Sequence, residues 1–167
     1  MIQKSISNSS LVIAGLVRNC EEKIADEIKR IHSAFSSAKK INWIIIESDS
    51  NDNTVLKIEN LKEKYPIELI TFGNLRNKLQ KRTERISFCR NAYLNELNNN
   101  SKYHDADYFV VADLDGVNSK LNSYYVDHCW KSGLDWDACF PNQVAPYYDI
   151  WALRHEIWCP NDVWEQY

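Results

Sequence analysis

The sequence predicts an α/β fold in which helices flank a mostly parallel sheet. Four short runs of apolar, often β-branched residues occur along the chain, at residues 11–17, 42–48, 67–72 and 108–115. The runs are continuously apolar rather than alternating, which is typical of strands that are covered on both faces. Segments of helical periodicity separate the runs, so the order is that of βαβ units with parallel strands.

Each segment between two runs places apolar residues on one face of a helix, at spacings of three, four or seven residues. These positions are, in chain order, Ile24, Ile28, Ile31 and Phe35, then Val55, Ile58, Leu61 and Tyr65, and then Ile86, Cys89, Tyr93 and Leu97. Pro66 ends the second helical segment. Beyond Gly116, a further helical segment leads into a stretch that is rich in aromatic residues, whose rings suit sugar faces as well as cores.

The bulk composition fits one globular domain. The chain has 167 residues, of which 44% are hydrophobic, and a formal net charge of -3. The charges are spread along the chain, so we expect no nucleic-acid partner. The N-terminal residues are polar and residues 11–17 are too short to cross a bilayer, so we expect no transmembrane segment and a location in the cytoplasm, or at the inner face of the membrane. Five cysteines without a C-x-x-C pair favour reduced thiols over a disulfide framework or a zinc site.

The fourth apolar run ends on two acids, Asp113 and Asp115. Alternate residues of an extended strand share a face, so these carboxylates point the same way from Cα atoms about 6.6 Å apart, while Leu114 points into the packing. Two like charges need a counter-charge, and a divalent ion such as Mg²⁺ or Mn²⁺ that also binds phosphate oxygens would supply it. The alternative is that the two acids only cap a loop.

The other strand ends carry further candidates. Glu47 ends the second run and can accept hydrogen bonds from a ribose or a base, whereas the polar residues after it, 48–54, suit turns and helix caps. Arg82 and Arg85 flank a helix start, where guanidinium groups and the helix N-terminus favour phosphate. Arg18, just past the first run, fits the same site by its position. In parallel sheets, ligands lie beyond the carboxyl ends of the strands, where all these residues are expected.

Four segments in this order resemble the GT-A fold glycosyltransferases, which use nucleotide-sugar donors and a D-x-D motif. They are "AGLVRNCE", "IIIESDSNDNT", "RTERISFCRNAYLNEL" and "DYFVVADLDGVN". The third and fourth are most similar to the fungal capsule-associated α-mannosyltransferase family and its bacterial relatives. The resemblance implies a GT-A, Rossmann-like sheet in a single domain over 1–167, with a nucleotide-sugar half at 10–118 and a short mixed acceptor half at 119–167.

The resemblance also implies roles for single residues. Asp113 and Asp115 would form the D-x-D that holds Mn²⁺ or Mg²⁺ and the donor, Glu47 would contact the nucleoside, and Arg85, Arg90 and Asn91 would face the donor phosphates and sugar. Such enzymes often add a histidine to the metal, for which His155 is the first candidate and His128 the second. The candidates for an acid near the reacting sugar, needed as a general base by an inverting enzyme, are Asp149, Glu156 and Asp162.

These features predict a metal-dependent glycosyltransferase of polysaccharide synthesis. It would move mannose or another hexose from a GDP- or UDP-sugar to a glycan or a lipid-linked acceptor. One alternative is a phosphatase of the haloacid dehalogenase type with Asp113 as nucleophile, although few residues follow Gly116 to complete such a site. A non-catalytic nucleotide-sugar binding protein is the other alternative. A nicotinamide dehydrogenase fits less well, because residues 14–21 contain one glycine instead of G-x-G-x-x-G.

Overall fold

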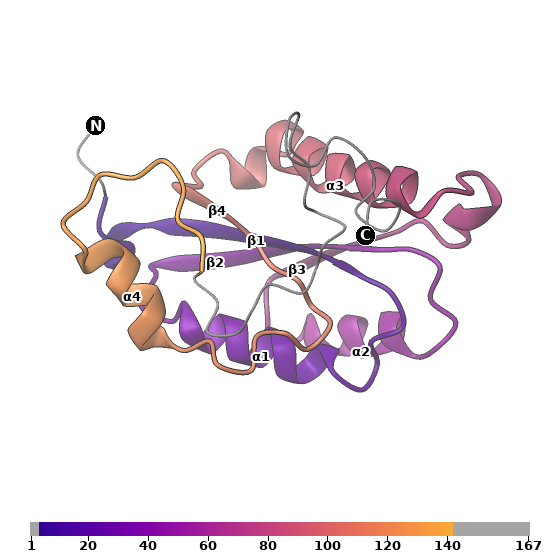
Figure 1. Ribbon diagram of the computed structural model, residues 1–167, viewed down its shortest axis with the longest axis horizontal. Helices are drawn as coiled ribbons and strands as arrows, with labels where there is room; N and C mark the ends of the chain where they lie inside the picture. The colour runs from indigo at the N-terminus through magenta and orange to yellow at the C-terminus, as the bar shows by residue number, and fades with distance from the viewer. Residues whose placement is uncertain (1–3, 142–167) are drawn as a thin grey trace, which may run out of the picture. The chain divides into compact units, whose positions relative to one another are not determined.

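A computed structural model describes residues 4–141 of the chain (Figure 1). Strands and helices alternate along it as predicted. The elements are β1 (Ser10–Val17), α1 (Ile24–Ala34), β2 (Lys40–Glu47), α2 (Thr54–Leu61), β3 (Ile67–Thr71), α3 (Arg82–Asn99), β4 (Tyr108–Val111) and α4 (Ser123–Lys131), with short 3-10 helices η1 (Ile6–Asn8), η2 (Leu75–Asn77) and η3 (Ser101–Tyr103). None of the helices in the described part of the chain is long and apolar enough to span a bilayer.

The four strands form one sheet in the order β3-β2-β1-β4, and every pair is parallel. β1 and β2 pair along their whole length, from Ser10 opposite Lys40 to Val17 opposite Glu47. The shorter pairing of β1 with β4 runs from Leu11 to Ala14 on the β1 side. The predicted α/β class with a parallel sheet between helices is therefore confirmed.

The sheet has a hydrophobic core on each face, which explains why its strands are apolar at successive positions. Leu11 and Ile13 of β1 pack in the cluster that includes α1, whereas Val12 and Ala14 pack in the cluster that includes Cys89 and other residues of α3. In Figure 1, α1 and α2 lie on one face of the sheet and α3 on the other. The predicted apolar positions Ile24, Ile28, Ile31 of α1 and Ile58 of α2 are all fully buried.

The fourth strand is shorter than predicted. We expected it to continue to Asp115, but β4 ends at Val111, and the last hydrogen bond to β1 runs from the Ala112 amide to the Ala14 carbonyl, at 2.9 Å. Beyond this bond, the Ala112 carbonyl oxygen and the Leu114 side chain pack against Gly15 of β1, whose missing side chain leaves room for them. Asp113 and Asp115 therefore lie in a loop just beyond the strand.

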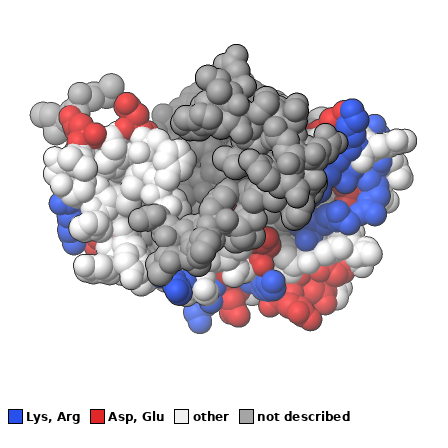
Figure 2. Space-filling model, viewed as in Figure 1, with Lys and Arg blue, Asp and Glu red and all other residues white. Residues whose placement is uncertain are grey.

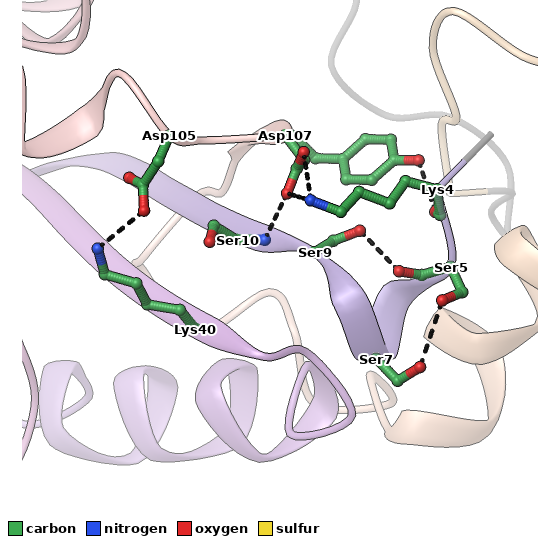
Figure 3. Close-up of polar contacts among 9 residues, drawn as sticks. Lys4, Ser5, Ser7, Ser9, Ser10, Lys40, Asp105 and Asp107 are labelled. Carbon is green, nitrogen blue, oxygen red and sulfur yellow. Dashed lines mark hydrogen bonds and ion pairs between the residues drawn. The ribbon is translucent and has the colours of Figure 1, made fainter. Parts of the chain in front are cut away.

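The amino edge of the sheet is tied together by a group of polar side chains (Figure 3). Asp107 accepts a hydrogen bond from the Ser10 amide at 2.8 Å and forms an ion pair with Lys4 at the same distance. The Tyr108 hydroxyl donates to the Lys4 carbonyl, and Lys40 pairs with Asp105 at 3.3 Å. These contacts hold the start of the described chain against the beginnings of β1 and β4.

The chain divides into a larger compact unit, Met1–Asp135, and a smaller one, Trp136–Tyr167. The sheet and helices α1 to α4 all belong to the larger unit. In it, Val126 of α4 is buried in the same core cluster as α1, so this helix packs with the sheet although it follows residue 118. The predicted division at residues 118 and 119 stays a prediction.

Candidate functional site

The chain changes direction within the sheet at β1. β2 and β3 follow on one side of β1, whereas β4 lies on its other side. In parallel α/β sheets, ligands bind beyond the carboxyl ends of the strands at such a switch point, because the connecting loops diverge there and leave room. The segments that follow β1, β2 and β4 therefore form the candidate site.

Asp113 and Asp115 follow β4 at this switch point. Both side chains are exposed, whereas Leu114 between them is 2% exposed and packs in the core on the α1 side of the sheet. This is the alternation that the sequence predicted, although it occurs in a loop rather than in the strand. The buried leucine anchors the loop, and the two carboxylates stay available to a ligand.

Two side chains that sequence reasoning did not select hold the backbone of this loop. Lys23, at the start of α1, donates from Nζ to the Asp115 carbonyl at 3.1 Å. Asn118 donates from Nδ2 to the Asp113 carbonyl and to Oε2 of Glu27, both at 2.6 Å. Lys23 belongs to none of the quoted motifs, and Asn118 closes the segment "DYFVVADLDGVN" without having been given a role. The contacts of Lys23 with Asp115 and of Asn118 with Glu27 join segments that are distant in the sequence, so no local pattern could have revealed them.

The segments after β1 and β2 are hydrogen-bonded to each other. The Asn19 amide donates to the Ser50 hydroxyl at 3.1 Å, and the Asn51 amide donates to the Asn19 side chain at 2.8 Å. Asn19 has a φ of 48°, in the left-handed region that asparagine tolerates better than most residues. Arg18, just before it, is exposed, and its place in the donor site stays a prediction.

Glu47, the last residue of β2, is only 3% exposed. Its Oε1 atom accepts a hydrogen bond from the Ser50 amide at 2.8 Å, so the side chain stabilises the turn that follows the strand. The predicted contact of Glu47 with a nucleoside stays a prediction. A nucleoside would have to bind the same carboxylate that accepts the hydrogen bond from the Ser50 amide.

Asp49, which was predicted to be a turn residue, binds the segment between β3 and α3. Its carboxylate is buried, accepts from the Arg76 amide at 2.8 Å and pairs with the Arg85 Nε atom at 3.5 Å. Its own amide donates to the Gly73 carbonyl at 2.7 Å. Asp49 has a φ of 62°, in the left-handed region. Its bonds attach the segment between β3 and α3 to the end of β2.

Arg85 was expected to face donor phosphates. The structure places its guanidinium against Asp49, and its Nη1 atom donates to the carbonyls of Leu79 and Gln80. The side chain is 14% exposed. In this arrangement Arg85 stabilises the start of α3, and its contact with phosphate stays a prediction.

The remaining predicted residues of α3, which are Arg82, Arg90 and Asn91, are exposed. Arg90 lies close enough to Tyr93 that its charge lowers the pKa of that phenol, and Asp113 acts on the same group in the opposite sense. Burial outweighs both charges and raises the Tyr93 pKa. Tyr93 of α3 therefore lies within electrostatic reach of both Arg90 and Asp113.

Basic side chains gather at the right of the face seen in Figure 2, at the end of the molecule where Figure 1 shows the segment before α3. The exposed cations of this segment and of the first turn of α3 include Arg76, Lys78, Lys81 and Arg82. Positive charge is thus concentrated near the carboxyl edge of the sheet even though the chain as a whole is acidic.

The donor set at Asp113 and Asp115 fits a hard divalent ion, because carboxylate oxygens and phosphate oxygens are the ligands that Mg²⁺ and Mn²⁺ take. Within residues 4–141, no group of three or more His, Cys, Asp or Glu side chains is arranged to hold a metal. The two acids would therefore need oxygens from a ligand or water to complete the coordination. His128, the second candidate, lies on α4, where its ring stacks on Tyr124.

The other predicted residues, Asp149, His155, Glu156 and Asp162, lie outside the described residues. No protein-family model matches the chain, and a search of curated proteins found no match either.

Proposed function

We propose that this protein is a metal-dependent glycosyltransferase with a GT-A arrangement. It transfers mannose or another hexose from a GDP- or UDP-sugar to a glycan or lipid-linked acceptor in polysaccharide synthesis, in the cytoplasm or at the inner face of the membrane. The observation that carries the proposal is the pair of exposed acids, Asp113 and Asp115, directly after β4 at the switch point of a parallel sheet. The order of the four sequence motifs supports sugar transfer, rather than another metal-dependent reaction, as the function of that pair.

The chemistry follows from the charges at this edge. Asp113 and Asp115 hold the divalent ion, which supplies positive charge to the departing nucleoside diphosphate. Arg18 follows β1, and Arg90 of α3 acts on the same phenol, Tyr93, as Asp113 does. In this proposal their exposed guanidinium groups stabilise the negative charge that develops on the diphosphate. Glu47 ends β2, which pairs with β1 on the side away from β4. In this proposal Glu47 and the segment after β2 receive the nucleoside.

The test is a donor screen with the purified chain. We expect GDP or UDP, and a sugar derivative of one of them, to raise the melting temperature only when Mn²⁺ or Mg²⁺ is present. Asp113→Asn should abolish this stabilisation, because it removes a charged metal ligand. Asp26→Asn is the matched control, since it removes an exposed carboxylate from α1, and it should leave nucleotide binding unchanged.

Three results would contradict the proposal. No metal-dependent stabilisation by any GDP or UDP compound would overturn the binding claim. Release of inorganic phosphate from a phosphomonoester, lost in Asp113→Asn, would favour the phosphatase. Metal-dependent binding without sugar transfer to any of a panel of glycan and lipid-linked acceptors would favour a non-catalytic nucleotide-sugar binding protein.

A further inference from the structure

The loop that carries the two acids is held by one side of helix α1. Lys23 and Glu27 lie four residues apart, so they are neighbours on the same face of the helix start. Lys23 donates directly to the Asp115 carbonyl, and Glu27 acts through Asn118, whose amide donates to the Asp113 carbonyl. The carbonyl of Asp115 is thus held by Lys23, at the start of α1. The carbonyl of Asp113 is held by Asn118, which binds Glu27 in the next turn of this helix.

Glu27 is an unusual residue for its position. It is 1% exposed and lies among the fully buried Ile24, Ile28 and Ile31, on the face that packs against the sheet. A buried carboxylate is costly unless it is paired and hydrogen-bonded. Glu27 meets both conditions, because Arg30 pairs with Oε1 and Asn118 donates to Oε2. The core thus retains a charged group that links α1 to the loop of Asp113.

The Lys23 side chain packs against the backbone of Gly116. Gly116 has a φ of 103°, which a residue with a side chain rarely adopts. A Cβ atom at Gly116 would also lie 2.8 Å from Cδ of Lys23, so the absence of a side chain lets the lysine stem cross the loop. Leu114, between the two acids, is buried in the core and anchors the loop to it. The backbone on either side of each carboxylate is therefore restrained.

We propose that Lys23, Glu27 and Asn118 are positioning residues, which we call the α1 clamp, and that they hold the carboxylates of Asp113 and Asp115 in the orientation that binds a divalent ion and its diphosphate. The inference rests on the proposed function for the identity of the ligand. Lys23 and Asn118 bind the backbone carbonyls of the two acids, Glu27 holds Asn118, and the two carboxylates are left to the ion. Loss of such outer partners typically weakens metal affinity about 10-fold to 100-fold.

The direct test measures Mn²⁺ affinity from the EPR signal of free Mn²⁺, with GDP or UDP present. Asn118→Ala, Lys23→Met and Glu27→Gln should each weaken Mn²⁺ binding about tenfold. Lys23→Arg should retain most of the affinity, because it keeps a donor for the Asp115 carbonyl. Asn118→Asp should bind more weakly than Asn118→Ala, because it adds a second carboxylate beside Glu27.

Matched controls separate positioning from a general loss of stability. Lys29→Met and Asn98→Ala change exposed residues of α1 and α3, and they should leave the Mn²⁺ affinity unchanged. Melting temperatures of the metal-free proteins show whether a variant is folded. Lys23 is exposed, so Lys23→Met tests the inference even if Glu27→Gln does not fold.

The outcomes distinguish this inference from the proposed function. If the wild type binds Mn²⁺ with a nucleotide and the folded clamp variants bind it equally well, the α1 clamp is overturned while the proposed function stands. If the wild type binds neither GDP nor UDP with Mn²⁺, the proposed function is overturned, and backbone NMR order parameters of residues 113–116 decide on the clamp. Lower order parameters in Lys23→Met and Asn118→Ala would support it, and unchanged ones would overturn it.

Discussion

Gly15 in the middle of the sheet lies directly against Leu114, the residue between the two candidate metal ligands. A Cβ atom at Gly15 would lie 2.6 Å from Cδ1 of Leu114 and 2.7 Å from the Ala112 carbonyl oxygen. The glycine in β1 thus makes room for the buried residue that anchors Asp113 and Asp115. The position of the candidate site depends on this absence of a side chain.

Gly15→Ala should therefore displace the loop after β4. We expect the free energy of unfolding in urea to fall by about 1–3 kcal/mol, the usual cost of overpacking a core, and Mn²⁺ binding to weaken. Gly73→Ala is the control, because no atom lies within 4 Å of its would-be Cβ and only its φ of 56° is unfavourable. An unchanged Mn²⁺ affinity in a folded Gly15→Ala variant would show that Leu114 does not set the site.

Asp49 should be more important for stability than its place in a polar turn suggests. Asp49→Ala leaves the half-buried Arg85 without its ion pair and the Arg76 amide without its acceptor, so we expect a loss of about 3–5 kcal/mol in the free energy of unfolding. Asp49→Asn keeps an acceptor and tolerates the φ of 62°, so its loss should be smaller. Urea denaturation measures both variants, and equal losses would contradict this account.

His32 should make stability depend on pH in the mildly acidic range. Burial, and then the charge of Lys64, lower the His32 pKa below its ordinary value of 6.5, and Nδ1 accepts a hydrogen bond from Nε1 of Trp43 at 3.4 Å. Because the folded state disfavours protonation, the stabilisation is complete above the unfolded pKa and is lost as the pH falls through 6.5 toward the lower folded pKa.

The His32 prediction is checked with denaturation curves between pH 7.5 and pH 5. His32→Gln keeps an acceptor for Trp43 without a titrating group, so its stability should change less over this range. His104→Gln is the control, because His104 is exposed on the surface, and it should keep the wild-type pH dependence. If His32→Gln and the wild type lose stability in parallel, another group is responsible.

Asp107 should stabilise the amino edge of the sheet except in strong acid. Its hydrogen bonds with Lys4 and the Ser10 amide lower the pKa of this carboxyl below its ordinary value of 3.8. The stabilisation is therefore present above the unfolded pKa and lost as the pH falls below 3.8 through the folded pKa. We expect Asp107→Ala to lower the free energy of unfolding by about 1–2 kcal/mol at neutral pH, because the Ser10 amide loses its acceptor.

Thermal denaturation at pH 7 and pH 2.5 tests the Asp107 prediction, since the difference between variant and wild type should shrink at the lower pH. Asp105→Ala is the matched control, because this acid is more exposed and pairs with Lys40 at the same edge. A typical exposed pair contributes about 0–1 kcal/mol, so its loss should be smaller. Equal effects of the two substitutions would contradict the role given to the Ser10 contact.

Local sequence patterns were enough to predict the elements. The apolar periodicity of Ile24, Ile28 and Ile31 fixed which side of α1 is buried, and the continuous apolar runs required cover on both faces of the sheet. The alternation of Asp113, Leu114 and Asp115 likewise predicted two exposed acids around a buried leucine. These features depend on neighbouring residues, whose side-chain directions follow from backbone geometry alone.

The ends of elements and the partners of polar groups were not predictable in this way. β4 ends at Val111, and the loop after it packs against Gly15, which lies almost a hundred residues earlier in the chain. The pairing of Arg85 with Asp49 likewise joins segments that share no local pattern, so it was not predicted.

The sequence by itself determined the series of strands and helices, their buried faces and the pair of acids after the fourth apolar run, because each follows from short-range periodicity. Only the tertiary structure decided that β4 lies beside β1, that Glu27 and Asn118 hold the Asp113 backbone, and that Asp49 holds Arg85. Strand order and these long-range hydrogen bonds depend on packing between segments that are distant in the sequence. Their energies therefore depend on groups that do not occur together in any short stretch of the chain.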